Sequence, residues 1–445
     1  MTENLMEKIV SLCKRRGFIN QSSEMYGGFA GVYDYGHLGV ELMNNIKGCW
    51  WKEMVQLRDN VTGLDSGIFT QAKVWDASGH TSAGFSDLLQ ECKKCHKRFR
   101  ADKISGDKKA AKCPECGGEL TKPKAFNLLV KTQFGPVGDE TGVTYLRGET
   151  AQGIYINYEN VKNSMRLKIP FGIAQIGKAF RNEITFGHFI FRTREFQQME
   201  HQFFINPKEA DKWFDYWRKE RMRWYIDLGI KKENLRFREH KEDELAHYAR
   251  KAVDIEYKFP FGWKELEGIH NRGDWDLSRH AKFSGHDLSY YDEEKKQKYI
   301  PYVIETSAGA DRTLLVVLLD AYEEIEGGRT TTTKSTKEKE VILRLDKNLA
   351  PIKVAVLPLV KKEPLVKLAR DIYKKLQKYW MSQYDEIGSI GRRYRRQDEI
   401  GTPYCLTVDF DSLDDKKATV RDRDTMKQER VATREILDYL KEKLE

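Results

Sequence analysis

The sequence predicts a large α+β domain that carries a small cysteine-rich insertion and is followed by a separate α/β domain. Strand-like and helical apolar patterns mix over residues 1–326. Two Cys-x₂-Cys pairs in a lysine-rich stretch mark an insertion at 86–125. A polar stretch without large apolar side chains, 327–340, predicts a linker. Strands alternate with helices over residues 341–445, which predicts an independent α/β domain.

The N-terminal part of the large domain predicts two helices separated by a loop. Residues 2–16 form an amphipathic pattern in which Leu5, Ile9 and Leu12 share one face. A loop rich in glycine and aromatic residues follows at 22–37. A second helix is predicted from apolar residues at three- and four-residue steps, namely Leu38, Leu42, Ile46, Trp50 and Met54.

Strand-like patterns dominate the rest of the large domain. They run, with loops, over residues 127–204 and return at 253–267 and 299–306. An Asn-Pro pair at 206–207 has the order of a helix cap followed by proline, so it predicts the start of a long tryptophan-containing helix. A strongly apolar helix is predicted to begin near Ala310.

The C-terminal part reads as alternating strands and helices. A continuous apolar run at 352–360 predicts a buried strand, and a helical pattern follows at 363–380. Residues 404–410 predict another strand, and 430–444 predict a final helix. This alternation favours a mostly parallel sheet.

The composition favours an enzyme with a polyanionic partner. The net charge is +9, from 77 basic and 68 acidic residues. This excess of basic residues is smaller than is usual in proteins that bind nucleic acid without specificity. Hydrophobic residues make up 40% of the chain, enough for sizeable cores. We find no export signal and no run near the roughly 18 apolar residues of a membrane span. We therefore expect a cytoplasmic protein with reduced thiols and no membrane association.

The paired cysteines predict a metal site. Seventeen residues separate Cys92-x₂-Cys95 from Cys113-x₂-Cys116, a spacing typical of tetrathiolate zinc. Four thiolates leave no open coordination position, so the predicted role of zinc is structural. Iron, or a site that has lost its metal, is the alternative. The other cysteines, Cys13, Cys49 and Cys405, are expected to be packing residues.

One hairpin-like segment, 179–204, carries groups suited to a nucleotide triphosphate and an amine. Arg181 and Arg192 are planar cations that match phosphate oxygens. Phe196 can lie against a purine, and Glu183 and Glu200 can accept hydrogen bonds from amines. A solvated basic hairpin tip is the alternative interpretation. A second segment with matching chemistry favours the functional one.

That second segment, 299–322, predicts a strand, a turn and a helix. Glu305 and Ser307 lie on one face of the strand because side chains alternate with period two. Gly309 permits a tight turn, and Arg312 falls in the first helical turn, where free amides and the helix dipole favour phosphate. A purely structural corner is the alternative.

These segments resemble class II aminoacyl-tRNA synthetases. The hairpin is similar to their motif 2, the strand–helix segment to motif 3, and residues 34–56 to motif 1, the dimer-interface helix. Within the class, SSEMYGG, SGH, RGETAQG, FRNE, FRTREFQQME and ELEGIHNRGDWDL resemble the homodimeric glycyl-tRNA synthetases. The resemblance implies a mainly antiparallel catalytic sheet with flanking helices, an anticodon-binding C-terminal domain and a homodimer.

The resemblance also implies the reaction. Glycine would attack ATP to give glycyl-adenylate, and glycine would then pass to the 3′ end of tRNA(Gly). Arg181 and Arg312 are the implied catalytic residues, on the α- and γ-phosphates; Phe196 would stack on adenine near Glu183, and Glu265 would hold Mg²⁺. The implied ATP-binding residues are Arg181, Asn182, Glu183, Phe191, Arg192, Thr193, Arg194, Glu195, Phe196, Glu265, Leu266, Gly309, Ala310, Asp311 and Arg312.

Glycine poses a specificity problem because it has no side chain to grip. A one-methylene difference is worth only about 1–3 kcal/mol even in a fitted pocket. The resemblance implies an acidic cage for the ammonium instead, with Arg272 and Arg100 complementing the carboxylate. The implied glycine-binding residues are Arg100, Glu149, Glu200, Arg272, Glu305 and Ser307.

Some positions depart from the family pattern, and two rival functions remain. His37, Thr306, Phe186 and His188 replace usual residues, although none of them removes a charged ligand.

Four arginines around a tyrosine in 391–404 are expected to contact tRNA, with a solvated helix face as the alternative. The rivals are a synthetase for another small amino acid and a non-catalytic tRNA-binding paralogue.

Overall fold

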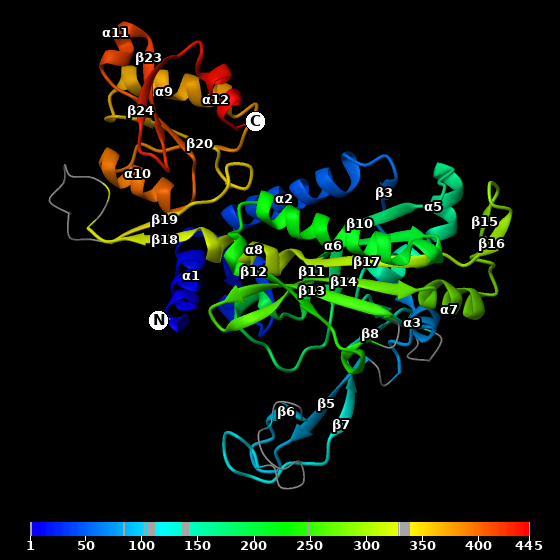
Figure 1. Cartoon of the computed structure of the whole chain (residues 1–445). Coiled ribbons are helices and arrows are strands. Elements are labelled where there is room, and N and C mark those ends of the chain that lie inside the picture. The colour runs from blue at the N-terminus through cyan, green and yellow to red at the C-terminus, as the bar shows by residue number, and fades with distance from the viewer. Residues whose placement is uncertain are drawn as a thin grey trace.

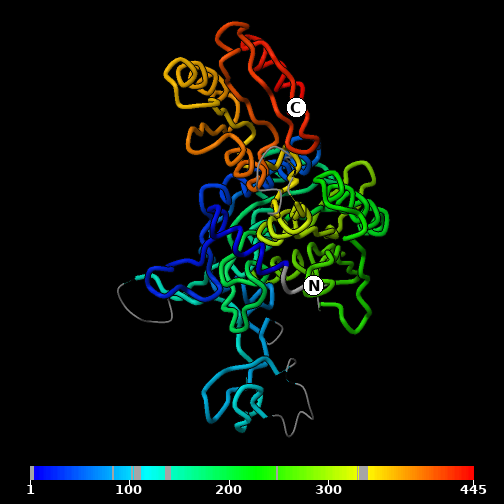
Figure 2. The backbone as a smooth tube through the Cα atoms, turned by 90° about the vertical axis from the view of Figure 1, so that its left-hand side faces the viewer, coloured from blue at the N-terminus to red at the C-terminus, as the bar shows by residue number. Residues whose placement is uncertain are grey.

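The chain folds into a main body with a smaller unit at each end. Figure 1 shows the C-terminal domain above the body and the cysteine-rich insertion below it, and the view in Figure 2 agrees. The predicted linker, 327–340, lies mostly outside the described residues. The computed structural model describes residues 2–82, 85–101, 104, 112–135, 142–246, 249–327, 329 and 339–444.

A seven-stranded sheet forms the centre of the body. Neighbouring strands pair antiparallel, except that the edge strand β3 pairs parallel with β10. This agrees with the mainly antiparallel sheet expected from the resemblance. In spatial order the strands are β12 (Leu235–Glu239), β13 (Lys251–Phe259), β14 (Gly262–Gly273), β17 (Tyr302–Gly309), β11 (Glu195–Ile205), β10 (Phe171–Phe180) and β3 (Val61–Gly63).

Long helices cover one face of this sheet and enclose the main hydrophobic core. α6 packs on β14 and β17, α8 packs on β11 and β17, and α1 and α2 pack against α8. Met199, Ile269 and Ile304 point from the strands into this core. The predictions of helices at 2–16 and 310 are confirmed, as is the Asn206-Pro207 cap. The four helices are α1 (Thr2–Arg16), α2 (His37–Trp51), α6 (Ala210–Asp227) and α8 (Ala310–Ala321).

Short helices cover only one end of the opposite face. α4 contacts β10 and β11, and α7 contacts both α3 and α4. Tyr155, Tyr158 and Phe204 pack together there. Because these helices stop short, the rest of the face stays open. They are α3 (Ala72–Ser78), α4 (Ala151–Ile156), α5 (Tyr158–Met165) and α7 (Trp275–Ser284).

The strand-like interpretation of residues 127–204 is therefore wrong over α4 and α5. These helices have six and eight residues, which is too short for a helical period to stand out from the strands on either side. The predicted strand at 253–267 is likewise two strands, β13 and β14, joined by a turn.

Small sheets surround the body. The insertion is a three-stranded sheet ordered β6-β5-β7, and its small core contains Cys92, Cys113 and Leu120. Within the described residues, no helix has the length and apolar content needed to cross a membrane. The strands are β1 (Ile19–Gln21), β2 (Tyr33–Tyr35), β4 (Phe69–Gln71), β5 (Ser86–Glu91), β6 (Arg98–Arg100), β7 (Lys124–Asn127), β8 (Val130–Gln133), β9 (Val143–Leu146), β15 (Tyr290–Asp292) and β16 (Gln297–Tyr299).

The C-terminal domain is a five-stranded mixed sheet between helices. α9 and α12 pack on one face and α10 on the other. A ribbon of β18 (Tyr322–Ile325) and β19 (Glu340–Leu343) precedes it. In spatial order the sheet contains β21 (Ser382–Tyr384), β20 (Val354–Pro358), β22 (Tyr404–Val408), β23 (Lys417–Asp422) and β24 (Gln428–Ala432), and the helices are α9 (Glu363–Leu376), α10 (Ile390–Glu399), α11 (Asp411–Asp415) and α12 (Ile436–Leu444).

Two expectations for this domain need correction. The sheet is only half parallel, because β23 and β24 pair antiparallel. The predicted helix at 430–444 begins at Ile436, since residues 428–432 form an edge strand. The alternating sequence Gln-Glu-Arg-Val-Ala has few apolar side chains, so its pattern was not distinct from that of a helix.

Candidate active site

A cleft of about 230 Å³ opens on the uncovered face of the central sheet. It collects side chains from β11, β14, β17, the loop between β10 and β11, and the start of α8. Their lining residues are up to 131 residues apart in the sequence, from Arg181 to Arg312. The predicted residues that line it are Glu149, Arg181, Glu183, Phe191, Arg192, Thr193, Phe196, Glu200, Glu265, Arg272, Glu305, Ser307, Gly309, Asp311 and Arg312.

Strand register brings the polar side chains together. Glu200 of β11 is paired with Ser307 of β17, and Glu305 of β17 is paired with His270 of β14. A register shift at Ile255 and Glu256 of β13 inserts one extra residue into β14 opposite them. Because of this bulge Glu265 faces the cleft, whereas Leu266 is fully buried in the core.

Two arginines held by aromatic rings lie at one end of the cleft. The Arg181 guanidinium lies 5.3 Å from the ring centres of both Phe85 and Phe196. Arg312 lies 4.5 Å from the ring of Phe191, and its Nη1 is 3.3 Å from Glu265 Oε2. Arg312 lowers the pKa of Glu265, so this carboxylate stays ionised. Fixed cations over aromatic faces suit a triphosphate.

The same end contains polar atoms with no partner of their own. Arg192 Nη1 is 3.6 Å from Glu183 Oε2, too far for a hydrogen bond. Both atoms are buried and, among the described residues, neither has a hydrogen-bond partner. Buried polar atoms in native proteins are normally satisfied, so this pair fits a ligand such as an adenine amino group or a phosphate.

Asp311 has a structural role at the start of α8. Its carboxylate accepts hydrogen bonds from the Tyr35 hydroxyl and, at 2.6 Å, from the Gln197 amide. Burial raises the pKa of Asp311, although both hydrogen bonds oppose the rise. Asp311 therefore fixes the helix N-terminus against β11, and the first-turn Arg312 is aimed into the cleft as a result.

Three carboxylates converge at the other end of the cleft. Glu305 takes two hydrogen bonds from Arg272 Nη1, at 3.0 and 3.2 Å, and one from Gln202 at 2.8 Å. Glu200 accepts a short hydrogen bond from the Thr150 hydroxyl. Glu149 accepts one from Gln152 at 2.9 Å.

The environment divides these carboxylates into two kinds. Burial alone would raise the pKa of Glu305, but Arg272 and His270 outweigh it and hold the pKa at about 2. Glu149 behaves similarly, since His80 and Arg272 hold its pKa well below the usual range despite burial. Burial, together with Glu305 and Glu149, raises the pKa of Glu200 well above its usual value. Glu305 and Glu149 therefore stay ionised, whereas the ionised form of Glu200 would be stabilised by a nearby cation.

Arg272 lies behind the carboxylates rather than between them. Its Nε and Nη2 donate to Asp276 at 2.7 and 2.9 Å, while Nη1 donates to Glu305. The side chain is 3% exposed. These contacts let Arg272 position Glu305 and offset the acidic charge; because Arg272 also lines the cleft, its contact with a substrate carboxylate stays a prediction.

Six predicted residues do not line the cleft. Arg100 ends β6 of the insertion, where its Nη1 lies 3.0 Å from Asp87, and it is not among the residues that line the cleft. Arg194 donates to the Glu183 carbonyl and lies against the rings of Phe29 and Phe186. Its role is to hold the loop. The remaining four are Asn182, Glu195, Leu266 and Ala310.

Four cleft residues were missed from the sequence. Gln198 bonds to Ser307 Oγ at 3.4 Å, and His270 Nδ1 is 2.9 Å from Glu305 Oε1. Gly268 has no room for a side chain, because a Cβ there would lie 2.6 Å from His270. Ile190 completes the set. Alternation from Glu200 and Arg272 along their strands could have identified Gln198, His270 and Gly268.

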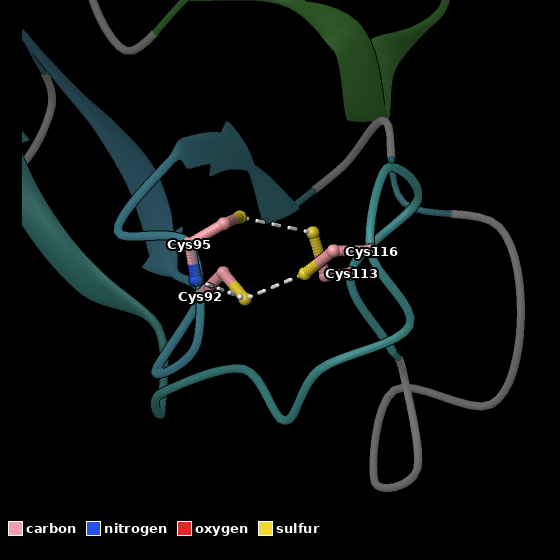
Figure 3. Close-up of side chains that lie close together, drawn as sticks. All are labelled: Cys92, Cys95, Cys113 and Cys116. Carbon is pink, nitrogen blue, oxygen red and sulfur yellow. Dashed lines mark hydrogen bonds between the residues drawn. The ribbon is translucent and has the colours of Figure 1, made fainter.

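The four cysteines of the insertion form a compact cluster. Figure 3 shows that the two Cys-x₂-Cys loops face each other and bring their sulfurs together. The Sγ atoms of Cys92 and Cys116 are 3.5 Å apart, those of Cys95 and Cys113 are 3.7 Å apart, and all four lie within 4.8 Å. Backbone amides donate hydrogen bonds to the Cys92 sulfur and lower its pKa to about 6; the amide of Cys95 has the largest effect. Tetrahedral zinc at about 2.3 Å from each sulfur requires sulfurs roughly 3.8 Å apart, so the donor set fits zinc.

Comparisons with known proteins match two parts of the chain to synthetase domains. Residues 137–321 match the tRNA synthetase class II core domain (G, H, P, S and T), and residues 353–443 match the anticodon binding domain. The glycine–tRNA ligase of Thermobifida fusca is 54% identical to this chain. The alignment covers 99% of this chain and 98% of that relative. Those of Treponema denticola and Borreliella burgdorferi are 53% and 54% identical, and each covers 98% of this chain.

These matches extend over both domains and nearly the full length of each relative. The class II core contains the strands that build the cleft, and the anticodon-binding match contains the C-terminal sheet. The chain belongs to the glycine–tRNA ligase family of class II aminoacyl-tRNA synthetases.

Proposed function

We propose that the chain is a glycine–tRNA ligase that activates glycine with ATP in this cleft and charges tRNA(Gly). The observation that carries the proposal is the meeting of three carboxylates, Glu200 and Glu305 buried and Glu149 partly exposed, with two ring-backed arginines in one cavity. Free thiols at all seven cysteines fit a reducing, cytoplasmic setting.

ATP would lie along the arginine end of the cleft. Phe196 provides an aromatic wall and Arg312 a cationic one, and the unsatisfied Glu183–Arg192 pair is the recognition site for adenine or phosphate. Glu265, half exposed at the mouth, is the ligand that would hold Mg²⁺, which neutralises phosphate charge. The glycine carboxylate is itself an anionic nucleophile, so the protein supplies position and positive charge rather than a base.

Glycine would lie at the carboxylate end, with its ammonium toward Glu149, Glu200 and Glu305. Arg272 is occupied by Asp276 and Glu305, so the substrate carboxylate is left to face Arg181 and the α-phosphate. This orientation is the one that attack on phosphorus requires. We expect larger amino acids to be excluded by space near Gly268 and Ser307, which line the cleft, since a Cβ at Gly268 would already lie 2.6 Å from the His270 ring.

The test is glycine-dependent ATP–pyrophosphate exchange. Arg181→Ala and Arg312→Ala should each lower kcat/KM by roughly 10²–10³-fold, the usual loss for a transition-state cation or donor, while tRNA binding persists. Glu305→Ala should weaken glycine far more than ATP. Normal exchange in either arginine variant would exclude the proposal, and exchange driven by another small amino acid would favour the rival synthetase.

The cysteine cluster is proposed to bind structural zinc. Its sulfurs already have the separation that tetrahedral zinc requires, and the surrounding core is very small, with Leu120, Phe99 and Ile104. Small units of this kind usually need a metal to stay folded.

The C-terminal domain is proposed to bind the tRNA anticodon. Three of the four arginines in the arginine-rich helix also bond to groups of the chain itself, and the contact of this helix with tRNA stays a prediction. Arg393 is 1% exposed and donates to the carbonyls of Pro358, Leu359 and Asp385, which ties together the loops after β20 and β21. Arg395 and Arg396 pair with Glu340 and Asp385. These side chains support the surface.

The exposed surface at the carboxyl ends of the parallel strands is better suited to RNA. Phe410, which is 45% exposed, lies 5.1 Å from Lys362 Nζ, and ring and cation together suit a stacked base and its phosphate.

We also propose a homodimer, as in the resembling family. The exposed Met25, Tyr26 and Leu57, which flank the motif 1 region, provide apolar surface for it. Light scattering of the purified protein tests the dimer.

A further inference from the structure

His80 lies just behind the cleft wall and touches one of its carboxylates. Its Nε2 is 3.3 Å from Glu149 Oε2, and the residue is 7% exposed. Ser78 Oγ lies 2.7 Å from Nδ1 on the opposite side of the ring. The Ser78 hydroxyl donates to the Trp75 carbonyl at 3.2 Å and can accept from Nδ1, which holds the ring with Nε2 facing Glu149.

Each cluster carboxylate has its own kind of partner. Glu305 has the Arg272 guanidinium and His270, and Glu200 has the Thr150 hydroxyl. Glu149 has His80 and the Gln152 amide. An unpaired carboxylate beside two others would protonate, and a protonated Glu149 could not attract an ammonium.

We propose that His80 is a positioning residue for glycine recognition, which holds Glu149 ionised and aimed at the substrate ammonium. This inference rests on the proposed function. His80 does not contact substrate in this account; it acts through Glu149.

The base of the cysteine-rich insertion fixes the imidazole in place. Asn127, the last residue of β7, donates its amide to the His80 carbonyl at 2.8 Å. The His80 ring packs against Phe85 at 4.5 Å and Trp75 at 5.1 Å between ring centres. Phe85 also lies against Arg181. Residues at the base of the insertion thus support one group at each end of the cleft. They support Glu149 through His80, and Phe85 supports Arg181 directly.

The charged groups that face Glu149 set its pH response. His80 faces it from the loop after α3, Arg272 from β14, Glu200 from β11 and Glu305 from β17. Asp276 and His280 of α7 reach it through the Gln152 side chain. Without His80, burial and the two neighbouring glutamates would raise the pKa of Glu149, so more of it would ionise as the pH rises.

The experiment measures glycine and ATP KM by tRNA-free pyrophosphate exchange between pH 6 and 9. His80→Ala should raise the glycine KM roughly tenfold to a hundredfold, as expected for a buried charge that has lost its partner, with the ATP KM little changed. The ratio of variant to wild-type glycine KM should shrink as the pH rises. His80→Gln, which keeps an N–H donor, should lie between wild type and His80→Ala.

Controls separate this role from a merely structural one. His286→Gln, at an exposed histidine, should behave as wild type. Asn127→Ala should reproduce a smaller, glycine-selective defect. A His80→Ala or His80→Gln defect that is equal for glycine and ATP, or one whose ratio to wild type does not change with pH, would overturn the proposal. Absence of exchange in the wild type would instead refute the proposed function.

Discussion

At the scale of single residues, charged neighbours decide which acidic groups of the cluster stay ionised. Glu149, Glu200 and Glu305 lie in one cluster, yet only Glu200 lacks a cationic partner, since Thr150 offers a hydroxyl. Its pKa is raised by burial and by the other two carboxylates. An arriving ammonium supplies the missing charge, so substrate binding and proton release are linked at this residue.

Glycine binding should therefore release a proton from Glu200. Because the carboxyl form competes with the ammonium, the glycine KM should fall as the pH rises from acid to neutral. Titration calorimetry with glycine, in buffers of different ionisation enthalpy and with a non-reacting ATP analogue present, measures the released proton directly. Glu200→Gln should remove the buffer dependence. Equal proton release in this variant would contradict the assignment.

A second residue-scale prediction concerns stability. His201 is fully buried on the helix-covered side of β11, and burial, with Arg58 and Arg221 nearby, lowers its pKa well below the usual value. In the unfolded chain the pKa returns to about 6.5, so below that pH the unfolded state binds a proton that the folded state does not. Stability should fall by up to about 1.4 kcal/mol per pH unit as the pH drops below 6.5. Urea unfolding at pH 5–8 measures this: the free energy of unfolding of the wild type should fall more steeply below pH 6.5 than that of His201→Gln.

At the scale of elements, long periodic segments were predictable and short ones were not. The helices at 2–16 and from 310 follow from apolar faces that repeat over three or more turns. α4 and α5 contain six and eight residues and were read as strand. The bulge in β14 was also invisible in the sequence, because nothing local marks the extra residue that turns Glu265 outward.

The insertion is the element whose folding should depend on metal. Its core within the described residues consists of the four cysteines and a few apolar side chains. We expect one zinc per chain, measured by elemental mass spectrometry, and none in Cys92→Ser/Cys113→Ser. Chelation should make 86–125 sensitive to protease while the body resists. A chelated protein with an unchanged digestion pattern would show that the cluster folds without metal.

At the scale of the whole molecule, the body and the C-terminal domain share a core. Leu343, Leu345 and Leu349 follow the ribbon that leaves the body, yet they belong to the main hydrophobic cluster. Arg15 and Arg16 of α1 also pair with Glu399 of α10. We propose that the C-terminal domain begins about ten residues later than the boundary predicted at 341, because these leucines pack with the body.

Truncation should distinguish the two boundaries. A chain ending at residue 340 loses three buried leucines, each worth about 2–5 kcal/mol, and should be poorly folded. A chain ending at 352 keeps them and should retain glycine-dependent pyrophosphate exchange while losing tRNA charging. Thermal unfolding and exchange assays on both chains measure this. Equal stability of the two chains would place the boundary at 341 after all.

The sequence by itself determined the chemistry available and the family to which it belongs. Arg181, Phe196, Glu305 and Arg312 stand in local patterns, strand–loop–strand and strand–turn–helix, whose geometry follows from periods of two and 3.6 residues. The cysteine spacing likewise fixes a four-sulfur cluster within one short segment.

Only the tertiary structure decided how those groups are used. Arg272 supports a carboxylate, Arg393 ties loops together and Arg100 lies in the insertion, although each had been expected to contact a ligand. The reason is physical: a buried guanidinium bonds to whichever acceptors surround it, and those come from strands distant in the sequence. His80 gained its place beside Glu149 in the same way, because charge in a buried cluster is set by neighbours in space.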